Sequence, residues 1–396
     1  MSGVVIVGGS VGGLTAAREL RAQGFSGSLT IIDADTRAPY RRPMLSKGFL
    51  DGTVDDARLA LPWPDDPAIR RLQPVQATGL AIADHRVLVT TAAGPETVSY
   101  DTLIIATGSS ARALDVPGAS DQALTLRDLQ DATTIRSALA TAHHVAIIGA
   151  GFLGLEIASV ARAGGRAVTV LEMGARPLER VAGSDVGTFI AALHARHGVD
   201  IHYQTSVTDV VGLSDSSIVR CSDGEEIRTD LLIAAVGSIP DTAWLEGTPV
   251  DTRSGVSCDA YGRALDQQGA VIPDTFAIGD AAAWWNPLYE RRMRIEHWTN
   301  AIDQGRHVAE TIVGADPPAF AVAPYFWSDQ YDARIHSIGS TIDYDEVEVL
   351  QSSEEHLLVA YGRAGTLVCV TGINVPKVLQ EYRPLVEARA AMSDLR

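Results

Sequence analysis

Short apolar runs, each followed by glycines and then by a helical pattern, recur along this chain. Residues 4–7 form the first run, and residues 14–20 carry the spacing of a helix. Residues 145–148 form a second run, which residues 155–163 follow in the same way. Continuous β-branched runs are typical of parallel strands buried on both faces. The pattern therefore predicts two strand–turn–helix units in an α/β protein.

The first glycine segment is Gly8-Gly9-Ser10-Val11-Gly12-Gly13, and the next predicted strand, residues 29–32, ends at Asp33 and Asp35. Backbone N–H groups at a helix start favour phosphate, and an acid after the second strand can bond a ribose hydroxyl. Ser10 replaces the usual middle glycine, but serine is small enough to keep the close approach. The segment predicts a dinucleotide site at Gly8, Ser10, Gly12 and Gly13.

The second glycine segment, Gly149-Ala150-Gly151-Phe152-Leu153-Gly154, is a full G-x-G-x-x-G, and the strand predicted over residues 168–171 ends at Glu172. An acid there bonds the ribose 2′-OH of NAD and repels the 2′-phosphate of NADP. Arg176 and Arg180 follow closely, so the strictness for NADH stays open. The alternative is that both segments are plain turns, but two motifs, each with its acid, disfavour it. We expect NADH at Gly149, Gly151, Gly154 and Glu172.

Three further predicted strands end in residues suited to a flavin. The strand within residues 100–109 leads to Thr107 and Gly108, and the strand within residues 230–240 leads to Gly237. Glycine lets a chain turn across a cofactor without a Cβ in the way. The third strand leads to Asp280, which can bond a ribityl hydroxyl, and we expect a helix N-terminus to follow it beside the phosphate.

Three longer segments of the chain match known motifs. The first is Pro39-Tyr40-Arg41-Arg42-Pro43-Met44-Leu45-Ser46-Lys47, similar to P-Y-x-R-P-P-L-S-K with Met44 in place of a proline. The others are Glu296-His297-Trp298-Thr299-Asn300-Ala301, similar to a flavin-edge segment, and Phe326-Trp327-Ser328-Asp329-Gln330-Tyr331, similar to F-W-S-D-Q-Y. In these segments the chain resembles the NADH-dependent ferredoxin reductases of bacterial oxygenase systems, and the resemblance covers nearly the whole chain. It implies hydride transfer from NADH to N5 of FAD and single-electron transfer to a 2Fe–2S ferredoxin.

The resemblance also implies the residues that contact FAD. Ala77 and Trp298 would act through their backbone, and Trp327 would either approach the flavin or belong to the core. The family's ribose acid falls on Ala34, so Asp33 and Asp35 both remain candidates. The implied FAD residues are Ser10, Gly12, Asp35, Lys47, Ala77, Arg127, Asp280 and Trp298. Arg42 and Trp327, which lie in two of the matching segments, are further candidates for cofactor binding.

Lys47 is one of two lysines in the chain, the other being Lys377. A compact ammonium can lie beside flavin N5, which suits lysine better than arginine. By the resemblance, Glu156 is the acid on the nicotinamide side. We therefore expect a catalytic Lys47–Glu156 pair near the flavin, against the alternative of a surface lysine and a helix-surface acid.

The 396 residues, 46% of them hydrophobic, are enough for two or three domains. We expect an α/β fold of glutathione-reductase-like layout, with two Rossmann-like dinucleotide-binding domains and a small C-terminal α+β domain. Residues 1–110 and 236–316 would bind FAD, residues 111–235 NAD, and residues 317–396 would form the last domain. Its predicted elements are strands over residues 334–340, 346–351, 356–361 and 366–371 and a helix over residues 375–392, after a linker at 315–318.

The net charge of −17 argues against nucleic-acid binding. Ferredoxins are usually acidic, so docking would need a local basic patch, for which the candidates are Arg291, Arg292, Arg294 and Arg306. The alternative is a solvated arginine face. No apolar run reaches membrane-span length, and a strand begins directly after Met1-Ser2, so we expect no signal peptide, no membrane partner and a cytoplasmic protein.

Cys221, Cys258 and Cys369 form no C-x-x-C pair, and none lies within residues 39–50. We therefore expect neither thiol chemistry beside the flavin nor a metal site.

Three other functions remain open for a protein with these two cofactors. They are a rubredoxin reductase, an NADH oxidase, and a redox-sensing protein of apoptosis-inducing-factor type that binds FAD and NADH without turnover.

Overall fold

The computed structural model describes residues 3–314 and 316–395, which form two compact units. The first unit comprises Met1–Arg41, Ala60–Ser110 and Ile239–Val322. The second comprises Arg42–Leu59, Ala111–Ser238 and Ala323–Arg396. Each unit contains one of the two predicted strand–turn–helix motifs.

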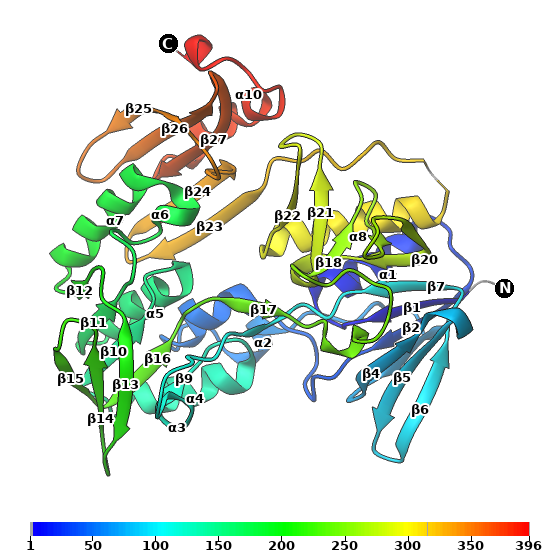
Figure 1. Cartoon of the computed structure of the whole chain (residues 1–396), viewed down its shortest axis with the longest axis horizontal. Helices are drawn as coiled ribbons and strands as arrows, with labels where there is room; N and C mark the ends of the chain where they lie inside the picture. The colour runs from blue at the N-terminus through cyan, green and yellow to red at the C-terminus, as the bar shows by residue number, and fades with distance from the viewer. Residues whose placement is uncertain (1–2, 315, 396) are drawn as a thin grey trace. The chain divides into compact units, whose positions relative to one another are not determined.

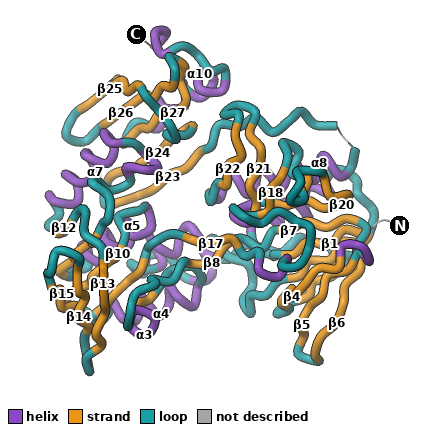
Figure 2. Tube along the Cα trace, in the orientation of Figure 1, coloured by secondary structure: helices purple, strands orange, loops and turns teal. Residues whose placement is uncertain are grey.

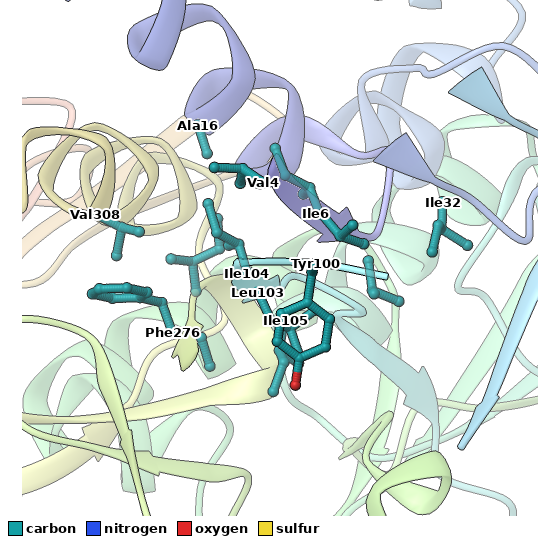
Figure 3. Packing of buried hydrophobic residues seen from close by; sticks show 14 of the residues in the cluster. Val4, Ile6, Ala16, Ile32, Tyr100, Leu103, Ile104, Ile105, Phe276 and Val308 are labelled. Carbon is teal, nitrogen blue, oxygen red and sulfur yellow. The ribbon is translucent and has the colours of Figure 1, made fainter. Parts of the chain in front are cut away.

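In the first unit, β1 (Gly3–Val7) lies between β2 (Ser28–Ile32) and β7 (Thr102–Ile105), parallel to both. Helix α1 (Val11–Ala22) connects β1 to β2, as the pattern predicts. The β-branched side chains of β1 are buried on both faces of the sheet. Figure 3 shows this core, with Val4 and Ile6 near Leu103 and Ile104. The carboxyl ends of β1 and β2 therefore bring the glycine loop and the following acids to one edge.

The sheet of the first unit has nine strands, in the order β22-β21-β18-β19-β20-β7-β1-β2-β3, and a separate three-stranded sheet follows the order β4-β5-β6 (Figure 1). The other elements are β3 (Ile69–Leu72), β4 (Gln76–Ala81), β5 (Arg86–Thr91), β6 (Gly94–Ser99), β18 (Val256–Cys258), β19 (Arg263–Leu265), β20 (Val271–Ala277), β21 (Ala282–Asn286), β22 (Arg291–Arg294) and α8 (Trp298–Ile312). A Cβ on Gly305 would lie only 2.9 Å from Gly12 O, which shows that α8 packs closely on α1.

The helix expected directly after Asp280 is wrong. A single 3-10 turn (Gly279–Ala281) is followed at once by β21. Trp284 of β21 is buried, and its Nε1 donates to Ala277 O at 2.7 Å. Residues 282–286 instead pair with β18 and β22 in the sheet, and the next helix, α8, begins only at Trp298.

In the second unit, β10 (His144–Ile148) lies between β11 (Ala167–Leu171) and β16 (Leu231–Ala234), parallel to both, and α5 (Phe152–Ala163) connects β10 to β11. The motif of the first unit is thus repeated, in a five-stranded sheet of order β12-β11-β10-β16-β9. The other elements are α2 (Asp56–Leu59), α3 (Ala119–Gln122), β9 (Ala123–Leu124), α4 (Leu129–Leu139), α6 (Glu179–Ala182), α7 (Ser184–Arg196), β12 (Asp200–His202), β13 (Val207–Gly212), β14 (Ser217–Cys221) and β15 (Glu226–Thr229). Strands β8 (Ser109–Ala111) and β17 (Ser238–Pro240) form a two-stranded sheet.

The C-terminal part of the second unit is an antiparallel sheet of order β23-β24-β27-β26-β25 (Figure 2). The four predicted strands are present, and a fifth, β23, covers the F-W-S-D-Q-Y segment. The strands are β23 (Tyr325–Gln330), β24 (Ala333–Gly339), β25 (Glu346–Ser352), β26 (Leu357–Arg363) and β27 (Thr366–Ile373).

The single helix expected over residues 375–392 is wrong. The structure has two short helices, α9 (Pro376–Glu381) and α10 (Arg383–Glu387), with Pro384 in the first turn of α10. Proline lacks the N–H that a continuing helix would need, and its ring clashes with the carbonyl four residues earlier. The chain therefore starts a new helix there.

Parts of two expectations fall outside the described residues, namely Met1 and Ser2 at the N-terminus and Ala315 in the linker. Residues 316–318 of that linker form no helix or strand. Within residues 3–314 and 316–395, no helix is both long enough and apolar enough to cross a bilayer.

Candidate functional site

The second glycine loop has the geometry of a pyrophosphate cradle. Gly149 has φ +103°, and a Cβ there would lie 2.5 Å from Ala235 O, so only glycine fits. Gly151 is the N-cap of α5 and has no other atom within 4 Å of its missing Cβ. An anion can therefore approach the start of α5 closely at Gly151, and the first N–H groups of a helix favour anions. The loop residues present fit a dinucleotide.

Glu172 is held at the edge of this loop, as predicted. Its carboxylate accepts hydrogen bonds from Ala150 N at 2.7 Å and from Gly174 N at 2.6 Å. These bonds fix the carboxylate next to the loop and leave it acceptor capacity for a ribose hydroxyl. The structure therefore brings Gly149, Gly151, Gly154 and Glu172 together.

The first loop repeats this geometry with serine in the middle position. Gly8 has φ +122°, and a Cβ there would overlap Ala106 O. Ser10 is the N-cap of α1 with φ −84° and ψ −168°, close to the φ −76° and ψ 178° of Gly151. Both are extended conformations that any residue adopts. Serine therefore preserves the backbone of the motif.

The first loop also separates the two candidate ribose acids. The Asp33 carboxylate lies against Gly9, where a Cβ would overlap it. Asp33 thus occupies the place that Glu172 has beside Ala150 in the second loop. Asp35 accepts instead from Tyr40 Oη at 3.1 Å and from Arg37 N at 2.9 Å, within its own turn. The internal repeat therefore equates Asp33, not Asp35, with Glu172.

The other expected flavin residues of the first unit lie on several elements. Thr107 Oγ1 donates to Asp241 O at 2.7 Å, and Ser109 Oγ lies 3.5 Å from the Asp280 carboxylate. Trp298 is the first residue of α8, and Ala77 lies in β4. Gly108 has a positive φ of +78°. Burial lowers the pKa of His297, beside Trp298, to about 4, so its imidazole is neutral at pH 7.

In the second unit, Arg42 Nη1 donates to Arg127 O at 2.8 Å. The backbone N–H of Arg127 is bound in turn by the Asp131 carboxylate at 2.8 Å, and Asp131 and Asp128 form the capping box that begins α4. Arg42 and Arg127, which the resemblance assigns to FAD, are thus neighbours. Gly237, with φ +102°, follows β16 in the same unit.

The expected Lys47–Glu156 pair is present. Lys47 lies in a short π-helix (Leu45–Phe49), and Glu156 lies on the buried face of α5. Lys47 Nζ donates to Glu156 Oε1 at 2.7 Å, and Ser46 Oγ donates to Oε2 at 2.5 Å. The side chains are 21% and 6% exposed. Neither is an ordinary surface residue, and the pair connects the P-Y-x-R-P-x-L-S-K segment to the first turns of α5.

The sequence did not predict the third donor to Glu156. Ser328 Oγ donates to Glu156 Oε1 at 2.6 Å, and Ser328 is fully buried. Strand β23 alternates, so Phe326, Ser328 and Gln330 point inward, whereas Trp327 lies half-buried on the opposite face. The alternation within F-W-S-D-Q-Y was the available signal, but residues 325–330 were not predicted to form a strand.

The four arginines expected to bind a partner belong to the first unit. Arg291, Arg292 and Arg294 lie on β22, an edge strand of the sheet. Arg294 pairs with Glu296, and Arg306 on α8 lies 3.7 Å from Glu19. Arg292 is exposed opposite Trp285, which is itself 40% exposed.

The three cysteines are buried free thiols. Burial raises the pKa of Cys221 and of Cys369 to about 11, which keeps both thiols protonated and unreactive at pH 7. In the part of the chain that the structure describes, no group of histidine, cysteine and acidic residues could hold a metal ion.

Two dinucleotide-type loops, each with its acid, and a buried Lys–Glu pair define a dinucleotide-dependent oxidoreductase. The comparisons agree. Residues 2–305 match the family described as pyridine nucleotide-disulphide oxidoreductase, and residues 325–395 match a reductase C-terminal domain. The chain belongs to the pyridine nucleotide-disulphide oxidoreductase family.

Its relatives include ferredoxin reductases. The 5,5′-dehydrodivanillate O-demethylase ferredoxin reductase subunit of Sphingobium sp. is 36% identical over 96% of this chain and 92% of the relative. Putidaredoxin reductase of Pseudomonas putida is 33% identical over 98% of this chain and 92% of the relative. The solved covalent putidaredoxin reductase–putidaredoxin complex matches with a TM-score of 0.91 and 31% identity, over 100% of this chain and 95% of that chain. These matches confirm the resemblance, the fold class, the oxidoreductase class and the FAD and NADH cofactors expected from the sequence.

Proposed function

We propose that this protein is an FAD-dependent ferredoxin reductase that oxidises NADH and reduces a 2Fe–2S ferredoxin, which in turn supplies an oxygenase. The observation that carries the proposal is the ion pair between Lys47 and Glu156, because Glu156 lies on α5, the helix that begins at the second glycine loop. A bound flavin accepts a hydride and releases electrons singly. Each NADH therefore yields NAD⁺, one proton and two electrons, which two ferredoxins accept.

The chain's own residues bind and orient the reactants in this proposal. The N–H groups of α5 hold the NADH pyrophosphate, and Glu172 accepts from the ribose. Lys47 directs its ammonium to flavin N5, and Glu156 holds Lys47 in place. Hydride transfer needs this fixed alignment of donor and acceptor.

For FAD, we propose that the N–H groups of α1 bind the pyrophosphate and that Asp33, as the equivalent of Glu172, binds the ribose. The remaining proposed FAD contacts are those expected from the strand ends and from the resemblance. They are Arg42, Ala77, Thr107, Gly108, Arg127, Gly237, Asp280, Trp298 and Trp327. We also propose the three-domain division given above, with the FAD domain in two segments.

The ferredoxin would dock on the arginines of β22 and on Arg306. The net charge of −17 means that an acidic partner needs such a local positive field to approach. Exposed Arg292 supplies it most directly, because Arg294 and Arg306 have acidic neighbours. We also propose a cytoplasmic location, since the three free thiols suit a reducing compartment.

The alternatives differ in where the electrons go. An oxidase that uses a cysteine beside the flavin is not supported, because the cysteines are buried and none lies in residues 39–50. A rubredoxin reductase would use the same NADH site, and a redox-sensing protein would keep the electrons.

Stopped-flow spectroscopy tests the proposal. The purified protein should be yellow, bleach with anaerobic NADH, and recover its colour rapidly with a 2Fe–2S ferredoxin but slowly with air or rubredoxin. A colourless protein would refute the flavin, and rapid reoxidation by air alone would favour an oxidase. A long-lived reduced state with every acceptor would favour the redox-sensing alternative.

A further inference from the structure

The polar contacts of Glu156 continue into the interior of the second unit. Ser328 and Gln330 lie two residues apart on β23 and so share its buried face. His194 lies on α7. All three side chains are 0% exposed. Fully buried polar groups are costly unless hydrogen-bonded, so their partners indicate what they do.

The three residues form a continuous series of hydrogen bonds that ends at Glu156. Ser328 Oγ donates to Glu156 Oε1 at 2.6 Å, and Gln330 Nε2 donates to Ser328 Oγ at 3.3 Å. His194 Nε2 lies 2.9 Å from Gln330 Oε1. Since this amide oxygen can only accept, His194 Nε2 must carry the hydrogen.

The protonation of His194 follows from its surroundings. Burial lowers the pKa of His194 to about 4, with His197 adding a smaller effect in the same direction, so the imidazole is neutral at pH 7. With the hydrogen on Nε2, Nδ1 is a bare acceptor, and it has no hydrogen-bond partner among the described residues. The tautomer is therefore fixed by Gln330, and the imidazole has one function, to donate to the amide.

In this series of three hydrogen bonds, each donated hydrogen is directed toward Glu156. Aligned hydrogen bonds polarise one another, so the last donor, the Ser328 hydroxyl, is strengthened by the two behind it. The same Glu156 oxygen accepts from Lys47, and the other accepts from Ser46. The carboxylate is thus held from three sides.

We propose that Ser328, Gln330 and His194 are positioning residues that fix the Glu156 carboxylate against Lys47 and partly neutralise its charge. They act through Glu156. The effect on the flavin rests on the proposed function, but the effect on Lys47 does not, so the two can be tested separately.

The first test measures Lys47 directly. The chain has only two lysines, so mass spectrometry after brief treatment with an N-hydroxysuccinimide acetate ester gives the acetylation rate of Lys47 against Lys377 as internal reference. In the purified holoenzyme, Gln330→Leu should lower the Lys47/Lys377 rate ratio about threefold, because a Glu156 carboxylate that carries more negative charge holds the Lys47 ammonium more strongly. An unchanged ratio would overturn the positioning role. This result holds whatever acceptor or cofactor the protein proves to use.

The second test measures the midpoint potential of the bound flavin. With its donors weakened, Glu156 presents more negative charge, so adding electrons becomes less favourable and the potential falls. A threefold change in the reduction equilibrium corresponds to about 14 mV for a two-electron couple. In a Glu156→Gln background the same Gln330→Leu change should have no effect on the potential. An equal shift in both backgrounds would show that Gln330 acts through packing alone.

Ser337→Ala is the matched control. Ser337 is also 0% exposed and lies on the adjacent strand β24, but its hydroxyl contacts Cys369 and Thr371 rather than Glu156. It should leave both readouts unchanged, and a response equal to that of Gln330→Leu would overturn the proposal. If Gln330→Leu does not fold, Ser328→Ala is measured in its place, with the same or larger shifts expected.

Discussion

Lys47 Nζ and Glu156 Oε1 lie 2.7 Å apart, although 109 residues separate them in the sequence. The ion pair joins a short π-helix to the first turns of α5 within one compact unit. A mostly buried charge pair is weak evidence for stability, because desolvation offsets the attraction. The first prediction tests the catalytic role that we propose for this pair.

Glu156→Gln should slow the reduction of the flavin by NADH about tenfold, since hydrogen bonds to charged groups contribute about 1.5–3 kcal/mol. The amide keeps the shape of the side chain but leaves Lys47 without its counter-ion. The rate is measured in stopped flow by the loss of flavin absorbance at saturating NADH. A rate within twofold of wild type would remove Glu156 from the mechanism.

Glu172→Ala should weaken NADH binding about tenfold and leave the flavin content unchanged, because one charged acceptor for the ribose is lost. The dissociation constant is measured by NADH titration, and flavin per protein from the visible and ultraviolet absorbance. Loss of bound FAD instead would mean that the two loops bind the opposite cofactors.

Asp33→Ala should reduce the bound FAD, because Asp33 lies beside the first loop as Glu172 lies beside the second. Asp35→Ala is the matched control and should retain FAD, since Asp35 is bonded within its own turn. Flavin retention after gel filtration measures both. The reverse outcome would make Asp35 the ribose acid.

Arg292→Glu should lower the second-order rate constant for ferredoxin reduction about threefold to tenfold at low ionic strength, because electrostatic steering is lost. The difference should shrink in high salt. Arg70→Glu is the control, since Arg70 is exposed on β3 at the other edge of the same sheet. Equal effects from both variants would indicate net charge rather than a docking site.

His194 should make the protein sensitive to mild acid. Its folded pKa of about 4 lies below the usual value of 6.5, so the unfolded state binds the proton first as the pH falls. The contribution of His194 to the free energy of unfolding is therefore complete above pH 6.5. It declines between pH 6.5 and 4 by roughly 3 kcal/mol, at 1.36 kcal/mol per pH unit. Urea unfolding of wild type and His194→Gln across this range checks the prediction. The variant should decline less steeply, and parallel curves would contradict it.

The sequence pattern predicted the strands, turns and helices that depend on neighbouring residues in the sequence. The apolar runs of β1 and β10 and the glycines after them specify strand, turn and helix within about thirty residues. The helix expected over residues 375–392 failed because Pro384 interrupts it. The helix expected after Asp280 failed because residues 282–286 pair with β18 and β22 in the sheet, which no local pattern reveals.

The site was predicted to a similar extent. The resemblance supplied Lys47 and Glu156, and the structure shows their contact. Ser328, Gln330 and His194 remained unseen because their link to Glu156 depends on the register of β23 and on the packing of α7. Those are properties of the tertiary structure, and single-sequence periodicity does not contain them.

Ser10 adopts nearly the torsion angles of Gly151. The middle position of the dinucleotide motif therefore requires a small side chain, but it does not require a left-handed backbone conformation. A search that insists on glycine there would discard this protein's first loop. A search that requires glycine at the position of Gly8 and allows any small residue two positions later would retain this loop. It would also find divergent family members that the stricter motif misses.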